Sequence, residues 1–416
     1  MNRSIYYRII NDMTKNTFLH VLKKYSLLGF LSISALGLGS IVSLLTLRSG
    51  MFEVLGSMDE NLTMPQKIAR EILDKCEVIG ERCYSNEFAK LAKVEDLDTS
   101  LTILDEVNKI DPQTRGCHLI AHSISTEETL KGVDKWQEVL EKVPADRCTG
   151  GFLHGIFEAR QSKDPTIEIN EQTIPELCEI VQEKAQGGND QECSHIMGHL
   201  LVVVKDGDLG EAAAVCDRLP QNLQYECHSG VFMENETRDG IVQHGLGTYI
   251  PWNKETTQEQ QDICESYDGI AAKGCWREIS HMFTFIAKDY PPEMFRLCAQ
   301  AEDVENVTDC YLHGVGVTVV SSNFDVKNME VLCAPFSRYD MFAKCVDMAI
   351  GSMMTSSIEF ASGVKALCSQ IPNNFKEGCY ERLGQHLVRL TGAQKTEEYC
   401  KDVPYPYQST CENPYL

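Results

Sequence analysis

The residues of this chain that are best suited to chemistry are its histidines, of which there are 11 in 416 residues. His118 and His122 are four residues apart, and so are His195 and His199. On a helix this spacing places both rings of a pair on the same face. The sequence therefore predicts paired imidazoles on two helices, and neutral imidazole is a common metal ligand in proteins.

A further set of residues stands six positions after a cysteine that recurs along the chain. The residues at this position are His154, His199, Met233 and His281. Histidine together with methionine suits copper, and histidine alone suits zinc. We therefore predict that imidazole and thioether side chains on successive helices bind copper or zinc. The candidate metal ligands are His118, His122, His154, His195, His199, Met233 and His281.

The same histidines fit an alternative interpretation, in which they only pack helices together. Later repeats have Gly316 and Gly351 at the aligned position, as expected where neighbouring helices approach closely. A histidine there would bond to a carbonyl of the next helix. Adjacent helices also hold equivalent residues about 10 Å apart, which is far for two rings to share one metal ion. Convergence of the rings would favour the metal interpretation.

Motifs of known enzyme classes are missing from the sequence. It contains no H-E-x-x-H, G-x-S-x-G, G-x-x-x-x-G-K-[ST] or G-x-G-x-x-G motif. Three histidines that converge around an open position on a metal ion can nevertheless be catalytic. We therefore predict a protein that is not an enzyme, and an extracytoplasmic enzyme with an unrecognised site stays as an alternative.

The chain has 18 cysteines, an even number, and most of them form close pairs along the sequence. The two members of such a pair are 7 to 15 residues apart. The C-x2-C pairs typical of structural zinc sites do not occur. The predicted disulfides are Cys76–Cys83, Cys178–Cys193, Cys216–Cys227, Cys264–Cys275, Cys298–Cys310, Cys333–Cys345, Cys368–Cys379 and Cys400–Cys411. Cys117 and Cys148 are left over, and whether they pair with each other stays open.

The second cysteines of the pairs recur with a period that is typical of helical repeats. Cys275, Cys310 and Cys345 are each 35 residues apart, which is the length of one helix–turn–helix unit. In each unit an amphipathic segment ends near the first cysteine, and an apolar segment begins at the second. The sequence thus predicts an all-α protein, an α-solenoid of helical hairpins. Each disulfide should tie the end of one helix to the start of the next.

A run of 23 uncharged, mostly apolar residues, Tyr25 to Leu47, precedes all the cysteines. As one helix, at about 1.5 Å per residue, it would span the roughly 30 Å hydrocarbon core of a membrane. It is longer than the apolar part of a cleaved signal peptide. Lys23 and Lys24, directly before it, place the N-terminus in the cytoplasm. We therefore predict a cytoplasmic tail (1–24), a transmembrane anchor (25–47), a linker (48–63) and an extracytoplasmic helical domain (64–416), where disulfides are stable.

The charge of the chain limits its partners. The net charge is −23, and because residues 1–48 contribute +5, the remainder carries −28. An acidic surface repels the phosphates of nucleic acids, so we predict no nucleic acid partner. It favours cations, or a protein or peptide with a basic surface.

In its period, its helix pairing and its cysteine pairing, the segment 65–416 resembles Sel1-like and tetratricopeptide-type repeat proteins, especially the cysteine-rich secreted Sel1-like class. The tetratricopeptide signature W-x2-L-G-x2-Y is absent from the sequence. The resemblance implies a curved scaffold that binds a protein or peptide, with a disulfide in each hairpin. Our leading hypothesis is therefore a membrane-anchored, extracytoplasmic interaction scaffold, and the alternative is a copper- or zinc-binding or trafficking protein.

Overall fold

We describe the chain from a computed structural model. The described residues are 62–76, 81–111, 117–145, 147–236, 253–286, 291–321, 332–333, 335 and 339–415. The chain divides into two units, Met1–Lys67 and Ile68–Leu416, and the helices from α4 onward all belong to the second. In these ranges all regular secondary structure is helical, apart from one isolated bridge between Pro144 and Gln186. The predicted all-α fold class is confirmed for the described residues.

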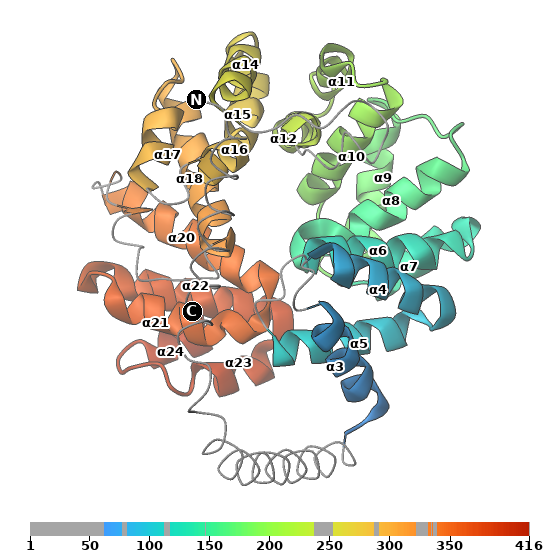
Figure 1. The fold of residues 1–416 in the computed structure, drawn as a ribbon. Helices are drawn as coiled ribbons and strands as arrows, with labels where there is room; N and C mark the ends of the chain where they lie inside the picture. The colour runs from blue at the N-terminus through green and yellow to red at the C-terminus, as the bar shows by residue number, and fades with distance from the viewer. Residues whose placement is uncertain are drawn as a thin grey trace, which may run out of the picture. The chain divides into compact units, whose positions relative to one another are not determined.

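The described helices follow one another along the chain (Figure 1). The earlier ones are α3 (Met64–Cys76), α4 (Glu81–Val94), α5 (Leu97–Ile110), α6 (Cys117–Leu130), α7 (Trp136–Lys142), α8 (Gly151–Lys163), α9 (Thr173–Lys184), α10 (Asp190–Val204), α11 (Leu209–Cys216) and α12 (Gln221–Glu236). The later ones are α14 (Lys254–Glu265), α15 (Gly269–Glu278), α16 (Ser280–Ile286), α17 (Pro291–Cys298), α18 (Val304–Ser321), α20 (Tyr339–Ser356), α21 (Ala361–Gln370), α22 (Asn373–Thr391), α23 (Ala393–Cys400) and α24 (Gln408–Glu412). Short 3-10 helices are η1 (Val133–Lys135), η2 (Cys148–Gly150) and η4 (Ile358–Phe360).

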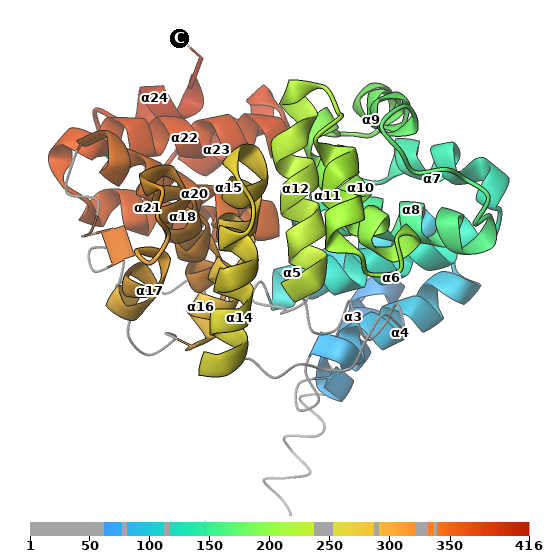
Figure 2. The same cartoon turned by 90° about the horizontal axis from the view of Figure 1, so that it is seen from above.

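The second unit is built from helices that pack against their neighbours in the chain. The helix with the first cysteine of a pair packs on the helix with the second, as α9 does on α10, α11 on α12, α17 on α18 and α21 on α22. The second helices also pack on one another, and α10, α12 and α15 lie side by side (Figure 2). The same unit of two helices thus recurs along the chain, so the fold is repeat-like, as the cysteine period predicts.

The local sequence explains why these segments are helical, and α5 is an example. Its N-cap is Asp96, whose side chain accepts a hydrogen bond from the backbone N–H of Thr99. Ile103, Leu104 and Val107 are fully buried, at the spacing of three and four residues that places apolar side chains on one face. Similar apolar faces along the chain form two core clusters, which extend from Ala69 to Val231 and from Phe232 to Cys411. The two clusters meet within α12.

All 18 cysteines are described, and all are paired in nine disulfides. Eight of these are the near-neighbour pairs that the spacing predicts. The ninth joins Cys117 to Cys148, the pair that the sequence left open. The fold is therefore cross-linked at regular intervals along its length.

The place of the cysteines in the helices differs from the prediction in one respect. The first cysteine often ends its helix, as Cys76 and Cys298 do. The second was expected to begin the next helix, but Cys227 and Cys310 lie six residues into α12 and α18. The polar residues before them, such as Gln221 and Asn222, are helical too, because they occupy the exposed face of the first turn. In these two hairpins the disulfide thus ties the end of one helix to the second turn of the next helix rather than to its first residue. Cys83 and Cys193 lie nearer the starts of their helices, two and three residues after the first residues of α4 and α10.

The predicted tail (1–24) and the predicted anchor (25–47) lie outside the described residues. Among the helices that are described, none has both the length and the apolar content that crossing a bilayer requires. The anchor therefore stays a prediction from the sequence.

Glycines allow two pairs of helices to approach very closely. A Cβ atom on Gly155 of α8 would collide with the backbone carbonyl oxygen of His122 on α6. A Cβ atom on Gly230 of α12 would collide in the same way with the carbonyl oxygen of His195 on α10. Only glycine fits where one helix backbone rests on another, so the pairs α6–α8 and α10–α12 are closer than side chains would otherwise permit.

We expect Gly230→Ala to destabilise the protein by about 1–3 kcal/mol or more, because the added methyl group must push α12 away from α10. Gly351→Ala in α20 is the matched control, since a Cβ atom there meets nothing within 4 Å. That change should stabilise by about 0.5–1 kcal/mol through the unfolded chain. Urea unfolding of the full chain measures both. Equal midpoints for the two variants would contradict the close contact of α10 with α12.

Candidate metal centre

Three histidines from two helices converge where α8 meets α10. His154 of α8 and His195 and His199 of α10 each offer one ring nitrogen, and these atoms all lie within 4.8 Å of one another. The ring centroids of His154 and His199 are 4.7 Å apart. The expectation that neighbouring helices hold such rings about 10 Å apart is therefore wrong here, because that distance separates helix axes. The side chains of both helices extend into the space between the axes and meet there.

His195 and His199 face each other through their Nε2 atoms, which are 3.2 Å apart. The Nδ1 of His199 donates to the carboxylate of Glu234 at 2.9 Å, since a carboxylate can only accept. The Nδ1 of His195 lies 3.2 Å from the hydroxyl oxygen of Ser229. This hydroxyl donates its single hydrogen to the Oε1 atom of Glu278. It must therefore accept the hydrogen of His195 Nδ1. The hydrogen-bond network therefore assigns the hydrogen of both rings to Nδ1, and the lone pairs of both Nε2 atoms face each other.

Two facing lone pairs repel each other, and either a shared proton or a metal ion would relieve this repulsion. Two nitrogens bound to one tetrahedral zinc at about 2.0–2.1 Å lie about 3.3–3.4 Å apart. The observed Nε2–Nε2 distance of 3.2 Å is close to this value. A carboxylate or hydroxyl behind each ring is also the usual support of a histidine ligand, because it fixes the tautomer and raises the basicity of the ligand nitrogen. Glu234 and Ser229 hold these two positions.

The cluster continues onto α6. The ring centroid of His154 is 4.9 Å from that of His118 and 6.3 Å from that of His122. His118 Nδ1 donates to the backbone carbonyl of Thr149 at 3.1 Å, which is the contact that the packing interpretation predicts. His122 Nε2 lies 2.9 Å from Glu158, whose other oxygen is 3.9 Å from His154 Nδ1. Two more imidazoles and one carboxylate thus surround the third histidine of the candidate centre.

Burial keeps several of these rings neutral at physiological pH. It lowers the pKa of His118 to about 3, and the neighbouring His154 ring acts in the same direction. It lowers the pKa of His154 to about 4, although Glu158 acts in the opposite direction. Burial and the adjacent His199 hold the pKa of His195 well below its usual value. A histidine must be neutral to bind a metal ion, so this environment prepares the nitrogens for that role.

The structure divides the seven predicted ligands into three sets. The five histidines of the cluster are His118, His122, His154, His195 and His199. Met233 lies on α12, where its chain neighbour Glu234 makes the bond to His199. His281 lies on α16 and belongs to a second group, in which one ligand atom each from Glu278, His281 and His313 lie within 4.8 Å of one another.

Sequence reasoning did not single out the polar partners of these rings. Glu158, Ser229, Glu234 and Glu278 were all missed. Glu158 is four residues after His154, a spacing that places the two side chains on one helix face. However, the chain has 61 acidic residues, so spacing alone does not identify the functional ones.

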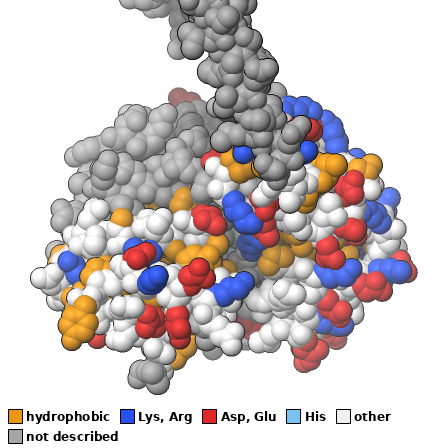
Figure 3. Space-filling model, turned by 90° about the horizontal axis from the view of Figure 1, so that it is seen from below, with side chains coloured by type: hydrophobic (Ala, Val, Ile, Leu, Met, Phe, Trp, Pro, Cys, Tyr) orange, Lys and Arg blue, Asp and Glu red, His pale blue; other side chains and the backbone are white. Residues whose placement is uncertain are grey.

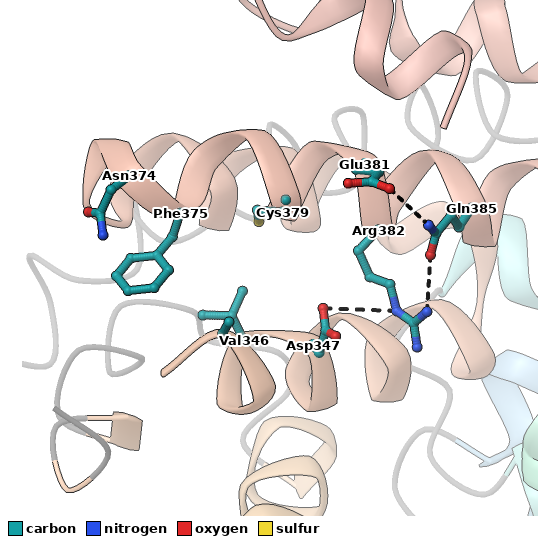
Figure 4. A pocket seen from close by; sticks show the side chains of 10 residues that line it. Val346, Asp347, Asn374, Phe375, Cys379, Glu381, Arg382 and Gln385 are labelled. Atoms are coloured by element: carbon teal, nitrogen blue, oxygen red, sulfur yellow. Dashed lines mark hydrogen bonds and ion pairs between the residues drawn. The ribbon is translucent and has the colours of Figure 1, made fainter. Parts of the chain in front are cut away.

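A separate pocket of about 250 Å³ lies between α20 and α22 (Figure 4). Arg382 extends across it and donates to Gln385 at 3.1 Å, with Asp347 3.9 Å from its Nε atom (Figure 4). None of the clustered histidines lines this pocket. No histidine lines the pocket, so we place the candidate metal centre at the histidine cluster.

On the face drawn in Figure 3, the charged side chains of the described residues are mixed rather than gathered by sign. Figure 3 shows acidic and basic side chains interspersed over the described part of one face. Several form ion pairs between helices, such as Lys75–Glu87 at 2.7 Å and Lys184–Glu141 at 2.6 Å. Exposed pairs of this kind contribute little to stability. The basic partner favoured by the net charge stays a prediction.

The fold and the site together define the class of this protein. The described residues form an all-helical, repeat-like, disulfide-linked fold with a histidine cluster, partly buried, between two of its repeats. No protein-family model, no curated protein and no solved structure matched the chain. The resemblance to cysteine-rich Sel1-like and tetratricopeptide-type proteins therefore stays a prediction.

Proposed function

We propose that this protein binds zinc through His154, His195 and His199, in a domain held outside the cytoplasm by an N-terminal membrane anchor. The observation that carries the proposal is the pair of facing Nε2 atoms of His195 and His199, 3.2 Å apart. Their Nδ1 atoms are both engaged elsewhere, so a metal ion bound by the two Nε2 atoms would relieve the repulsion of their lone pairs.

Zinc fits this set better than the other candidate, copper. All three ligand groups are imidazoles, and the spacing of the two facing nitrogens is that of a tetrahedral ion. Copper would be favoured by a thioether, but the bond from α12 to the cluster is made by Glu234 rather than by Met233. Three nitrogens leave one tetrahedral position open, and His118, His122 and Glu158 lie beside His154 to fill it or to bind water there.

Two features support the proposed location. Nine disulfides suit an oxidising compartment, because cytosolic reductants keep such pairs reduced. The apolar run from Tyr25 to Leu47 is long enough to anchor the chain. A protein or peptide partner for the repeat scaffold stays a prediction from the sequence.

The test is a zinc titration of the purified full-length chain, first stripped with a chelator. We expect tight binding of zinc that a large excess of Mg²⁺ does not displace, because exposed carboxylates would not make that distinction. Binding should also release protons if a proton now lies between the two rings, which calorimetry in two buffers of different ionisation enthalpy measures. Less than a tenth of an equivalent of zinc after dialysis would exclude the proposal.

A further inference from the structure

The second group of potential ligands lies on the next helices along the chain. Glu278 ends α15, His281 lies on α16 and His313 on α18, and one ligand atom from each lies within 4.8 Å of the other two. The ring centroids of His281 and His313 are 5.0 Å apart. This set of two nitrogens and one carboxylate oxygen differs in chemistry from the three imidazoles of the candidate zinc centre.

The two oxygens of the Glu278 carboxylate have different surroundings. The side chain is buried, with 1% of its surface exposed. Its Oε1 atom accepts from Ser229 and lies 3.2 Å from Arg277 Nε. Its Oε2 atom accepts no hydrogen bond from the described residues, and His281 Nε2 is 3.5 Å away. One oxygen is thus held by the protein, while the other is buried and directed at an imidazole.

The second imidazole of the group is held in a similar way. His313 Nδ1 lies 3.0 Å from the backbone carbonyl of Arg277 and 3.0 Å from the hydroxyl of Ser280. A carbonyl only accepts, so Nδ1 carries the hydrogen and Nε2 keeps its lone pair. The orientation of the ring is therefore fixed from behind, as that of metal-binding histidines usually is.

From this geometry we propose that Glu278, His281 and His313 form a second metal site, which binds a divalent ion such as Mn²⁺ or Fe²⁺. Two imidazoles and one carboxylate are the ligand set of sites for these ions, which leave further positions open to water or substrate. The buried Oε2 atom of Glu278 supplies the negative charge that these harder ions prefer over an all-nitrogen set. The proposal goes beyond zinc binding and does not depend on it.

One hydroxyl group, that of Ser229, contacts ligands of both sites. Ser229 accepts from His195 of the zinc centre and donates to Glu278 of the second site. One hydroxyl thus orients a ligand in each of the two groups.

The test is a titration of the chelator-stripped full-length chain with Mn²⁺ in the presence of excess Mg²⁺, followed by the loss of the electron paramagnetic resonance signal of free Mn²⁺. We expect one Mn²⁺ per chain in the wild type. Glu278→Gln and His313→Gln should each weaken binding at least tenfold, since each removes a ligand or its charge.

Two control variants separate this proposal from its alternatives. Glu226→Gln removes a carboxylate that also contacts Arg277, at 2.8 Å, but is not in the group, and it should leave Mn²⁺ binding unchanged. His199→Ala removes a zinc ligand and should also leave Mn²⁺ bound, so failure of either site is seen separately. If Glu278→Gln fails to fold, the Mn²⁺ affinity of His281→Gln tests the proposal instead. The His281 side chain is 28% exposed, so its replacement should disturb the fold less. Mn²⁺ binding that is absent in the wild type, or unchanged in His281→Gln and His313→Gln, would overturn the proposal.

Discussion

Replacing His199 by alanine should lower the affinity of the chain for zinc by at least about 100-fold, because loss of one of three ligands removes a metal–nitrogen bond and opens the site to water. The same change removes one of the two facing Nε2 atoms, so the repulsion between their lone pairs disappears. Competition with a fluorescent zinc chelator measures the affinity.

Two further variants show whether the loss of zinc affinity comes from removal of a ligand. Glu234→Gln keeps all three imidazoles but removes the carboxylate bonded to His199 Nδ1, and support of this kind is worth about 10–100-fold in metal affinity. His386→Ala is the matched control, since this buried histidine of α22 is not part of either ligand group. It should leave zinc affinity unchanged although it costs stability. Equal zinc affinity in His199→Ala and His386→Ala would show that the cluster serves only to pack helices.

Reduction of the nine disulfides should unfold the chain. Each bond closes a loop of 7 to 31 residues, and in the chain-entropy model a loop of about 15 residues is worth about 3 kcal/mol. Even if the nine contributions add only in part, their sum exceeds the stability of about 5–15 kcal/mol that is typical of folded domains. Circular dichroism with and without a phosphine reductant, with thiols alkylated to prevent reoxidation, measures the loss of helix.

A single bond at the end of the chain is the control for that experiment. Replacing Cys400 and Cys411 by serine opens only the bond between α23 and α24. We expect a loss of about 2–4 kcal/mol with the rest of the fold retained. A fully reduced chain with the urea midpoint of the oxidised one would contradict the structural role of the disulfides. Free thiols in the native protein, found by alkylation and mass spectrometry, would contradict the oxidised compartment as well.

The sequence by itself determined the helical class, the repeat period and eight of the nine disulfides. These properties are local, since they depend on residues within one hairpin. Cys216 and Cys227, for example, are 11 residues apart, so the hairpin that contains them brings them together whatever lies beyond it. The pair Cys117 and Cys148 is 31 residues apart, which is why its bond became clear only in the fold.

The candidate sites were decided by tertiary structure. The spacing of His195 and His199 predicted that they share a helix face, but not that His154 of another repeat would meet them. That meeting depends on how α8 and α10 pack. The neighbouring approaches, of α8 to α6 and of α12 to α10, are set by backbone contacts at Gly155 and Gly230. No periodicity in one chain segment reveals such a contact between two helices.

The hydrogen bonds behind the rings depend on the same packing. Glu234 and Ser229 are ordinary polar residues of α12 in the sequence, and only the close contact of α12 with α10 turns them into partners of His199 and His195. Helix packing also places His281 in the second group rather than in the first cluster, because Glu278 and His313 lie beside it in the fold. The sequence thus supplied the ligand types and their local spacing. Helix packing selected which of them face each other, since the ring contacts form between helices of neighbouring repeats.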